Sequence, residues 1–173
     1  MKGVCAIHHD KALALVTRSS SHALMNLMLP PDHEPVLPQG MTPPWHPIMN
    51  LRGHDLRNGF PEQPVACMVR DPIERFRSAC ARRGKTAAEG LTLLASDVHF
   101  WPLRDMGLLA EEVTHFRFPD QIDECATWLG LPTPVPTLNA ESDEGKPTLT
   151  AAQEAAVREL YADDIALWDS LNQ

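Results

Sequence analysis

The residues from Pro64 to Gly84 constrain the fold of this chain more than any other part of the sequence. Residues 64–70, PVACMVR, form an apolar run with the length and composition of a buried strand. A helix start follows at once, because Asp71 suits the N-cap, Pro72 the first helical position and Gly84 the end. A buried strand that turns directly into a capped helix predicts one β-α unit of an α/β fold.

Strand and helix patterns alternate along the rest of the chain. Two apolar segments separated by HHDK predict a hairpin, or a short edge strand that leads into a buried strand. The expected strands are residues 3–8, 12–17 and 112–118, and the expected helices are residues 23–29, 86–97, 119–130 and 150–171. This alternation predicts an α/β domain with a mainly parallel sheet, and 173 residues suit a single domain, 1–173.

Prolines are concentrated in one part of the chain. Ten of the 16 prolines lie between Pro30 and Pro72, so that no long helix or strand fits there. We expect residues 31–63 to form a loop region with short pieces of regular structure. Long irregular loops in a compact domain are often functional.

The composition argues against several classes of partner, although it leaves room for a local basic pocket. With 15 Lys and Arg against 23 Asp and Glu, the net charge is −8, which disfavours binding to nucleic acid or to an anionic membrane. No apolar run approaches the roughly 18 residues of a membrane helix. The first 16 residues lack a signal-peptide pattern, and we therefore expect a cytoplasmic protein.

The four cysteines form no CxxC pair, so the sequence indicates neither a zinc knuckle nor a redox motif. Three of them lie in apolar surroundings and are expected to be small buried side chains of a reduced protein. Cys5 could bind a metal with His8 and His9, but a turn after an edge strand is the simpler interpretation. We expect no metal site.

Two expected strand-to-helix turns are unusually polar: TRSSSH and RDPIER. Ligands of parallel sheets bind at the carboxyl ends of the strands, where such turns lie. In the first turn, Arg18 supplies charge and Ser19, Ser20 and Ser21 supply hydroxyls, next to the backbone N–H groups of a helix start. The turn therefore suits a phosphate, although a serine-rich N-cap would explain the same residues.

The second turn offers a second anion site. Helical spacing of about 100° per residue predicts an apolar face packed on the sheet and a polar face directed outward. The apolar face holds Ile73, Phe76 and Cys80, and the polar face holds Arg75, Ser78 and Arg82. Arg70 lies at the strand tip, and its forked donors match a phosphate. Either a ligand with phosphates at both ends uses both turns, or the arginines pair with neighbouring acids on a surface helix.

The stretch PVACMVRDPIERFRSA resembles the 3′-phosphate motif of sulfotransferases that use 3′-phosphoadenosine 5′-phosphosulfate (PAPS), above all the carbohydrate 2-O-sulfotransferase type. This resemblance implies a three-layer, P-loop-like fold in which Arg70 and Ser78 bind the 3′-phosphate. TRSSSHA is similar to the family's 5′-phosphosulfate loop, which implies cofactor binding by Arg18, Ser19, Ser20, Ser21 and His22. Arg18 stands where the family has lysine, and His22 where it has threonine.

A Gly-His pair, Gly53-His54, precedes Arg70 by 16 residues and is similar to the pair that carries the general base of 2-O-sulfotransferases. The resemblance thus implies that His54 takes the acceptor proton and that Arg18 steadies the leaving phosphate, without a metal. His22 and His99 are alternative bases, and His99 belongs to HFWPLRD, another stretch similar to the family.

These observations predict a sulfotransferase that moves a sulfuryl group from PAPS to a hydroxyl or amine of a carbohydrate or small molecule. Two alternatives stay open: a degenerate relative that binds nucleotide without turnover, favoured by Arg18 and His22, and a P-loop-like phosphotransferase. The latter lacks a GxxxxGK[ST] loop. We expect acceptor contacts in the proline-rich region, from Trp45, His46, Arg52 and Arg57.

Overall fold

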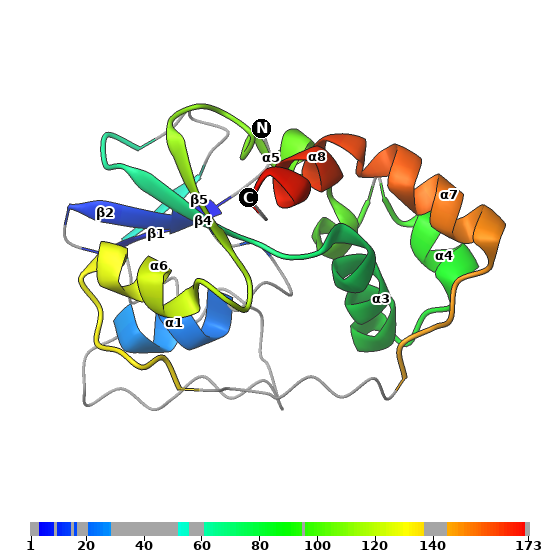
Figure 1. Ribbon diagram of the computed structural model, residues 1–173, viewed down its shortest axis with the longest axis horizontal. Helices are drawn as coiled ribbons and strands as arrows, with labels where there is room; N and C mark the ends of the chain where they lie inside the picture. Colours follow the sequence, from blue (N-terminus) through cyan, green and yellow to red (C-terminus); the bar gives the residue numbers. More distant parts are fainter. Residues whose placement is uncertain are drawn as a thin grey trace.

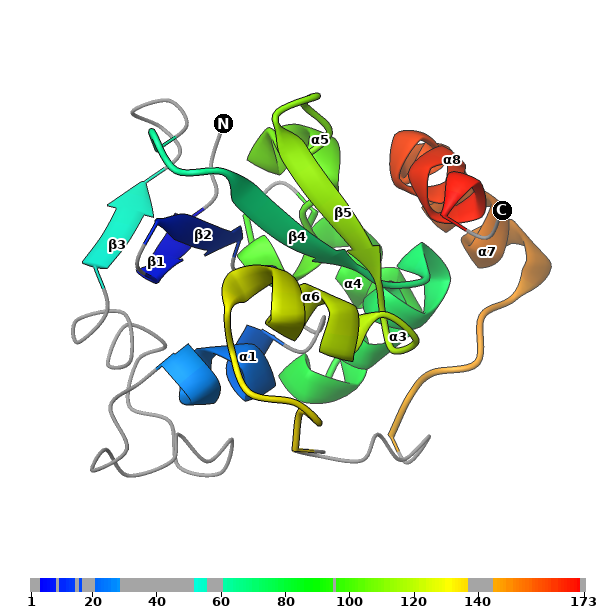
Figure 2. The same ribbon diagram turned by 60° about the vertical axis from the view of Figure 1, so that its left-hand side comes forward.

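The structure is a computed structural model that describes residues 4–8, 10–14, 16, 21–28, 52–55, 61–94, 96–136 and 145–171. Its described strands form one sheet in the order β3-β1-β2-β4-β5, which runs from left to right in Figure 2. The strands are β1 (Val4–His8), β2 (Lys11–Ala14), β3 (Arg52–Asp55), β4 (Val65–Val69) and β5 (Val113–Arg117). The neighbours β2, β4 and β5 are parallel, whereas β1 runs antiparallel to β2 and β3. The predicted α/β class is confirmed.

The first two strands form the hairpin that the sequence suggested. His8 pairs with Lys11, so only two residues connect β1 to β2. β1 is not an edge strand, because β3 pairs along its other side. This β3 is a short piece of regular structure within the proline-rich region.

Helices cover both faces of the sheet (Figure 1). Successive residues of a strand point to opposite faces, so Leu13 and Met68 face one helical layer while Ala14 and Cys67 face the other. The first layer consists of α1 (Ser21–Met28) and α6 (Ile122–Leu129), and the second of α5 (Leu103–Met106) and α8 (Ala162–Ser170).

A third apolar cluster lies beside the sheet and is built from helices alone. It joins α3 (Pro72–Arg83), α4 (Ala87–Thr92), the short 3₁₀ helix η2 (Val98–Phe100) and α7 (Ala151–Leu160). The expectation that Phe76 and Cys80 pack against the sheet is therefore wrong. The Phe76 ring instead meets Phe100 and Tyr161, at centroid distances of 5.6 and 6.5 Å. The reason is visible in Figure 1: α3 extends away from the strand ends and meets other helices.

The boundaries of α3 follow the local sequence. Asp71 Oδ1 accepts hydrogen bonds from the backbone N–H groups of Ile73 and Glu74, at 2.8 and 3.0 Å. Gly84 ends the helix with a positive φ of 60°, a conformation that glycine adopts without strain. Both predicted ends are confirmed, since caps act over a few residues and need no tertiary contact.

The last predicted helix, residues 150–171, is wrong in one respect: it is two helices, α7 and α8, that meet at Tyr161. Tyr161 has φ −104° and ψ 25°, outside the helical range. Its side chain is buried, and its hydroxyl donates to the Phe100 carbonyl oxygen at 2.5 Å. The break lets α7 cover the helical cluster while α8 covers the sheet.

Candidate functional site

The candidate site lies at the end of the sheet formed by the carboxyl ends of the parallel strands. Because β2 and β4 are parallel neighbours, their carboxyl ends meet at the same edge. β4 passes there into Arg70 and α3, and β2 is followed by α1. Ser21 and His22 are the first two residues of α1, and the structure describes only their backbone. Arg18, Ser19 and Ser20 lie outside the described residues.

Arg70 is the first residue beyond β4, and only 7% of its side chain is exposed. Its guanidinium carbon lies 5.9 Å from the centre of the Phe118 ring. The chain beside it is fixed, since the Phe118 N–H donates to the Val69 carbonyl oxygen at 2.7 Å and extends the pairing of β4 with β5. Arg70 Nη2 also lies 3.8 Å from Glu74 Oε2, one turn into α3.

Ser78 lies on the same side of α3 as Glu74, one turn further along, because residues four apart are neighbours on a helix. Arg70 therefore reaches along the flank of α3 that carries Ser78. The structure brings these two predicted phosphate ligands to the same side of one helix.

The predicted outward face of α3 is only partly correct. Arg82 is exposed, whereas Ser78 and Arg75 are buried, with 1% and 3% exposure. Helical spacing alone predicted one buried face. The helical cluster and α8 surround α3 on more than one side, so residues opposite Phe76 are also covered.

Arg75 forms a buried ion pair and belongs to the scaffold. Its Nη2 lies 2.7 Å from Asp164 Oδ2, and it also donates to the Trp101 carbonyl oxygen at 3.2 Å. Both oxygens of Asp164 lie 3.0 Å from the Leu103 N–H. Burial raises the pKa of Asp164, and Arg75 and the Leu103 N–H counter this rise. The pair ties α3 to α5 and α8.

Glu74 forms ion pairs with three cationic side chains, two from its own stretch of the chain and one from a distant segment. Besides Arg70, it pairs with Arg77 on α3 and with Lys146, whose Nζ lies 3.2 Å from Glu74 Oε2. Arg77 Nε donates to the Pro147 carbonyl oxygen at 3.0 Å, so the segment before α7 is fastened to α3 at two points. Lys146 was not predicted from the sequence, because it lies 72 positions from Glu74 and no local pattern links the two residues.

His54 lies in β3, at the opposite edge of the sheet from β5. It pairs with Cys5, which pairs with Ala14, so the three residues form one row across the sheet. The His54 backbone is thus at the level where β2 ends, two strands or about 10 Å away. The structure does not describe the His54 side chain.

His99 lies at the other end of α3 from Arg70. Its Nδ1 is 2.7 Å from Asp97 Oδ1, and Asp97 also accepts from Arg83 Nε at 2.6 Å. Burial alone would raise the pKa of Asp97, but hydrogen bonds from the His99 backbone, the His99 ring and Arg83 together lower it. Arg83 ends α3, whose 12 residues span about 18 Å. The structure therefore separates His99 from Arg70.

Comparisons of this chain with family models, curated proteins and solved structures found no significant match. Within the described ranges, no group of three His, Cys, Asp or Glu residues could hold a metal ion. No helix in the same ranges is long and apolar enough to cross a membrane. Of the expected acceptor contacts, Arg52 begins β3, and Trp45, His46 and Arg57 lie outside the described residues.

Proposed function

We propose that this protein is a PAPS-dependent sulfotransferase with a three-layer, P-loop-like fold, and that it acts on a hydroxyl or amine of a carbohydrate or small molecule. One observation carries the proposal: Arg70, at the carboxyl end of β4, reaches along the side of α3 that holds Ser78. That arrangement lies at the edge where β2, the strand before the serine-rich turn, also ends.

Arg70 and Ser78 bind the 3′-phosphate in this proposal. Arginine offers two parallel N–H donors to phosphate oxygens, and each charge-assisted hydrogen bond contributes about 1.5–3 kcal/mol. The contact of the Arg70 guanidinium with the Phe118 ring restricts this side chain before any ligand arrives. A restricted arginine loses less entropy on binding than a mobile one.

The turn between β2 and α1 holds the 5′-phosphosulfate. Arg18, Ser19 and Ser20 supply charge and hydroxyls, and the backbone N–H groups at Ser21 and His22 supply donors at the positive end of α1. Neighbouring strands are about 4.8 Å apart, so the two turns are close enough for one nucleotide to reach both.

His54 acts as the general base. It takes the proton of the acceptor hydroxyl, whose oxygen forms a bond to sulfur while the bond from sulfur to the 5′-phosphate oxygen breaks. Arg18 and the amides of α1 stabilise the negative charge that develops on the leaving phosphate. By analogy with phosphoryl transfer, positioning and charge stabilisation supply most of the rate enhancement.

Ligand binding tests the proposal. We expect adenosine 3′,5′-bisphosphate to raise the melting temperature by several degrees at saturation. Arg70→Gln should abolish this shift and Ser78→Ala should weaken it, whereas Arg82→Gln, on the exposed side of α3, is the control that keeps it. Stabilisation by ATP·Mg²⁺ with none by the bisphosphate would refute the proposal in favour of a phosphotransferase.

An assay of turnover distinguishes a sulfotransferase from a degenerate relative that only binds the nucleotide. The degenerate relative is favoured by Arg18 and His22, which stand where the family has lysine and threonine. We expect release of adenosine 3′,5′-bisphosphate from PAPS in the presence of an acceptor, and its loss in His54→Ala with cofactor affinity kept. Tight binding without turnover by the unaltered protein would establish the degenerate relative instead.

A further inference from the structure

Glu74 occupies an unexpected position for an acidic residue in a phosphate site. Its carboxylate is 3.8 Å from the Arg70 guanidinium and belongs to the turn of α3 directly before Ser78. If Arg70 and Ser78 hold a 3′-phosphate, as the proposed function requires, that phosphate must lie beside Glu74. Two negative groups then share one cation.

Lys146 approaches the same carboxylate from another part of the chain. Its side chain is only 6% exposed, and its Nζ lies 3.2 Å from Glu74 Oε2. Arg77, bound to the other oxygen of Glu74, fixes the neighbouring Pro147 through its carbonyl oxygen. Burial of an ammonium group is costly without an anion, so Lys146 depends on the negative charge at this point.

We propose that Glu74 is a built-in competitor of the 3′-phosphate and that Lys146 is a further cation of the phosphate site. Glu74 holds Arg70 and Lys146 together in the free protein. A bound phosphate monoester takes over part of this role, so that Lys146 reads the 3′-phosphate and Glu74 limits the affinity. The pair thereby determines how well the site distinguishes a 3′-phosphorylated nucleotide from one without that group. This inference rests on the proposed function and deepens it.

Calorimetric titration of two variants with adenosine 3′,5′-bisphosphate and with adenosine 5′-monophosphate tests the proposal. Glu74→Gln should lower the Kd for the bisphosphate by about tenfold, because a like charge beside the bound phosphate is removed in a partly screened position. Lys146→Gln should raise that Kd by about tenfold. Neither change should alter the Kd for the monophosphate by more than about twofold.

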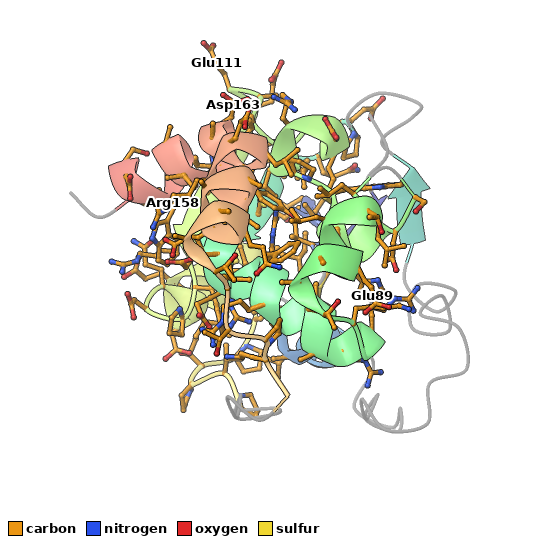
Figure 3. All side chains as sticks on the ribbon, turned by 90° about the vertical axis from the view of Figure 1, so that its right-hand side faces the viewer. Glu89, Glu111, Arg158 and Asp163 are labelled. Atoms are coloured by element: carbon orange, nitrogen blue, oxygen red, sulfur yellow. The ribbon has the colours of Figure 1, made fainter. Side chains whose placement is uncertain are left out.

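Matched controls remove the same charges elsewhere. Glu154→Gln loses a carboxylate that pairs with Arg158, which projects from α7 in Figure 3, and Lys85→Gln loses a lysine that pairs with Glu89. Each control changes the net charge by the same amount, and in the same direction, as its own test variant, so a general attraction between protein and nucleotide would affect a test variant and its control alike. We expect the controls to bind both ligands as the unaltered protein does.

Each outcome decides one proposal or both. If the bisphosphate binds but neither test variant differs from its control, the roles of Glu74 and Lys146 are refuted and the proposed function stands. If no nucleotide binds, yet inorganic phosphate stabilises the protein and Lys146→Gln removes that effect, the anion site stands and the proposed function is refuted. If neither nucleotide nor phosphate binds, both proposals are wrong. Circular dichroism of each variant establishes that it is folded.

Discussion

Replacing Asp164 tests the central contact of the helical part of the protein. Asp164→Asn keeps an acceptor for the Leu103 N–H but leaves the Arg75 guanidinium, which is 3% exposed, without its counter-charge at 2.7 Å. Removing one partner of a buried ion pair costs about 3–5 kcal/mol. Arg75 keeps its contacts with the Trp101 carbonyl oxygen and the Tyr161 ring. We therefore expect Asp164→Asn to lower the free energy of unfolding by about 3 kcal/mol, the lower end of this range. That is a large part of the 5–15 kcal/mol that stabilises a typical domain.

Urea denaturation, followed by tryptophan fluorescence and by circular dichroism, measures this loss. The control is Asp163→Asn, because Asp163 is the preceding residue of α8, projects outward in Figure 3, and pairs with exposed Arg104 at 3.2 Å. Exposed pairs contribute about 0–1 kcal/mol, so the control should change stability little. A loss below about 1 kcal/mol in Asp164→Asn would show that the Arg75 charge is not confined to the interior, and would refute the reasoning.

The double variant Arg75→Met with Asp164→Leu completes the experiment. It removes both charges, so no uncompensated ion remains in the interior, and apolar replacements of buried pairs are often neutral. We expect it to be more stable than Asp164→Asn, with a favourable coupling between the two sites. A double variant less stable than each of its single variants, Arg75→Met and Asp164→Leu, would contradict the electrostatic explanation.

Three further predictions follow from buried groups. The pKa of Asp97 is lowered in the folded protein, so this residue stabilises the fold above about pH 4, its unfolded pKa, and the contribution is lost as the pH falls through the folded pKa. In urea denaturation at pH 7, Asp97→Asn should therefore be less stable than the unaltered protein. The difference should vanish in acid. Burial raises the pKa of Cys80 to about 11 and that of Cys125 to about 12, so both thiols should react with a disulfide reagent at pH 8 only in urea, and rapid reaction in buffer would contradict their burial. Gly90→Ala should lower the unfolding free energy by about 1–3 kcal/mol, because an added Cβ would lie 2.6 Å from Cys80 Sγ, and an unchanged urea midpoint would refute this close contact.

The elements that the sequence predicted well are those determined by neighbouring residues. The strand before Arg70 and the helix after it have their signals within a few positions: an apolar run, an N-cap at Asp71 and a glycine at Gly84. The helix that ends at Gly130 was predicted on the same grounds, and Cys125 on its apolar side is buried as expected. Such signals act locally, so they survive whatever the rest of the chain does.

The features that the sequence did not predict depend on distant partners. Arg75 is buried because Asp164, 89 residues away, receives it, and nothing near Arg75 indicates that acid. Tyr161 interrupts a well-patterned helix because its hydroxyl reaches the Phe100 carbonyl oxygen across the helical cluster. At the candidate site, a sequence motif predicted Arg70 and Ser78. The role of Glu74, which lies between them on α3, became apparent only from its contact with Lys146 in the structure.

The break at Tyr161 has a consequence for how the chain acquires its structure during synthesis. Val157 and Tyr161 complete the helical cluster, and Leu167 and Trp168 close one face of the sheet. The helical cluster and the apolar cluster on this face of the sheet therefore both need residues of α7 and α8. The other residues of the two clusters are synthesised much earlier. A nascent chain that ends before α7 leaves apolar residues of both clusters exposed. Because synthesis begins at the amino end, neither cluster can be fully packed before α7 and α8 are made. We expect the final packing to be a single late event that joins sheet and helices together.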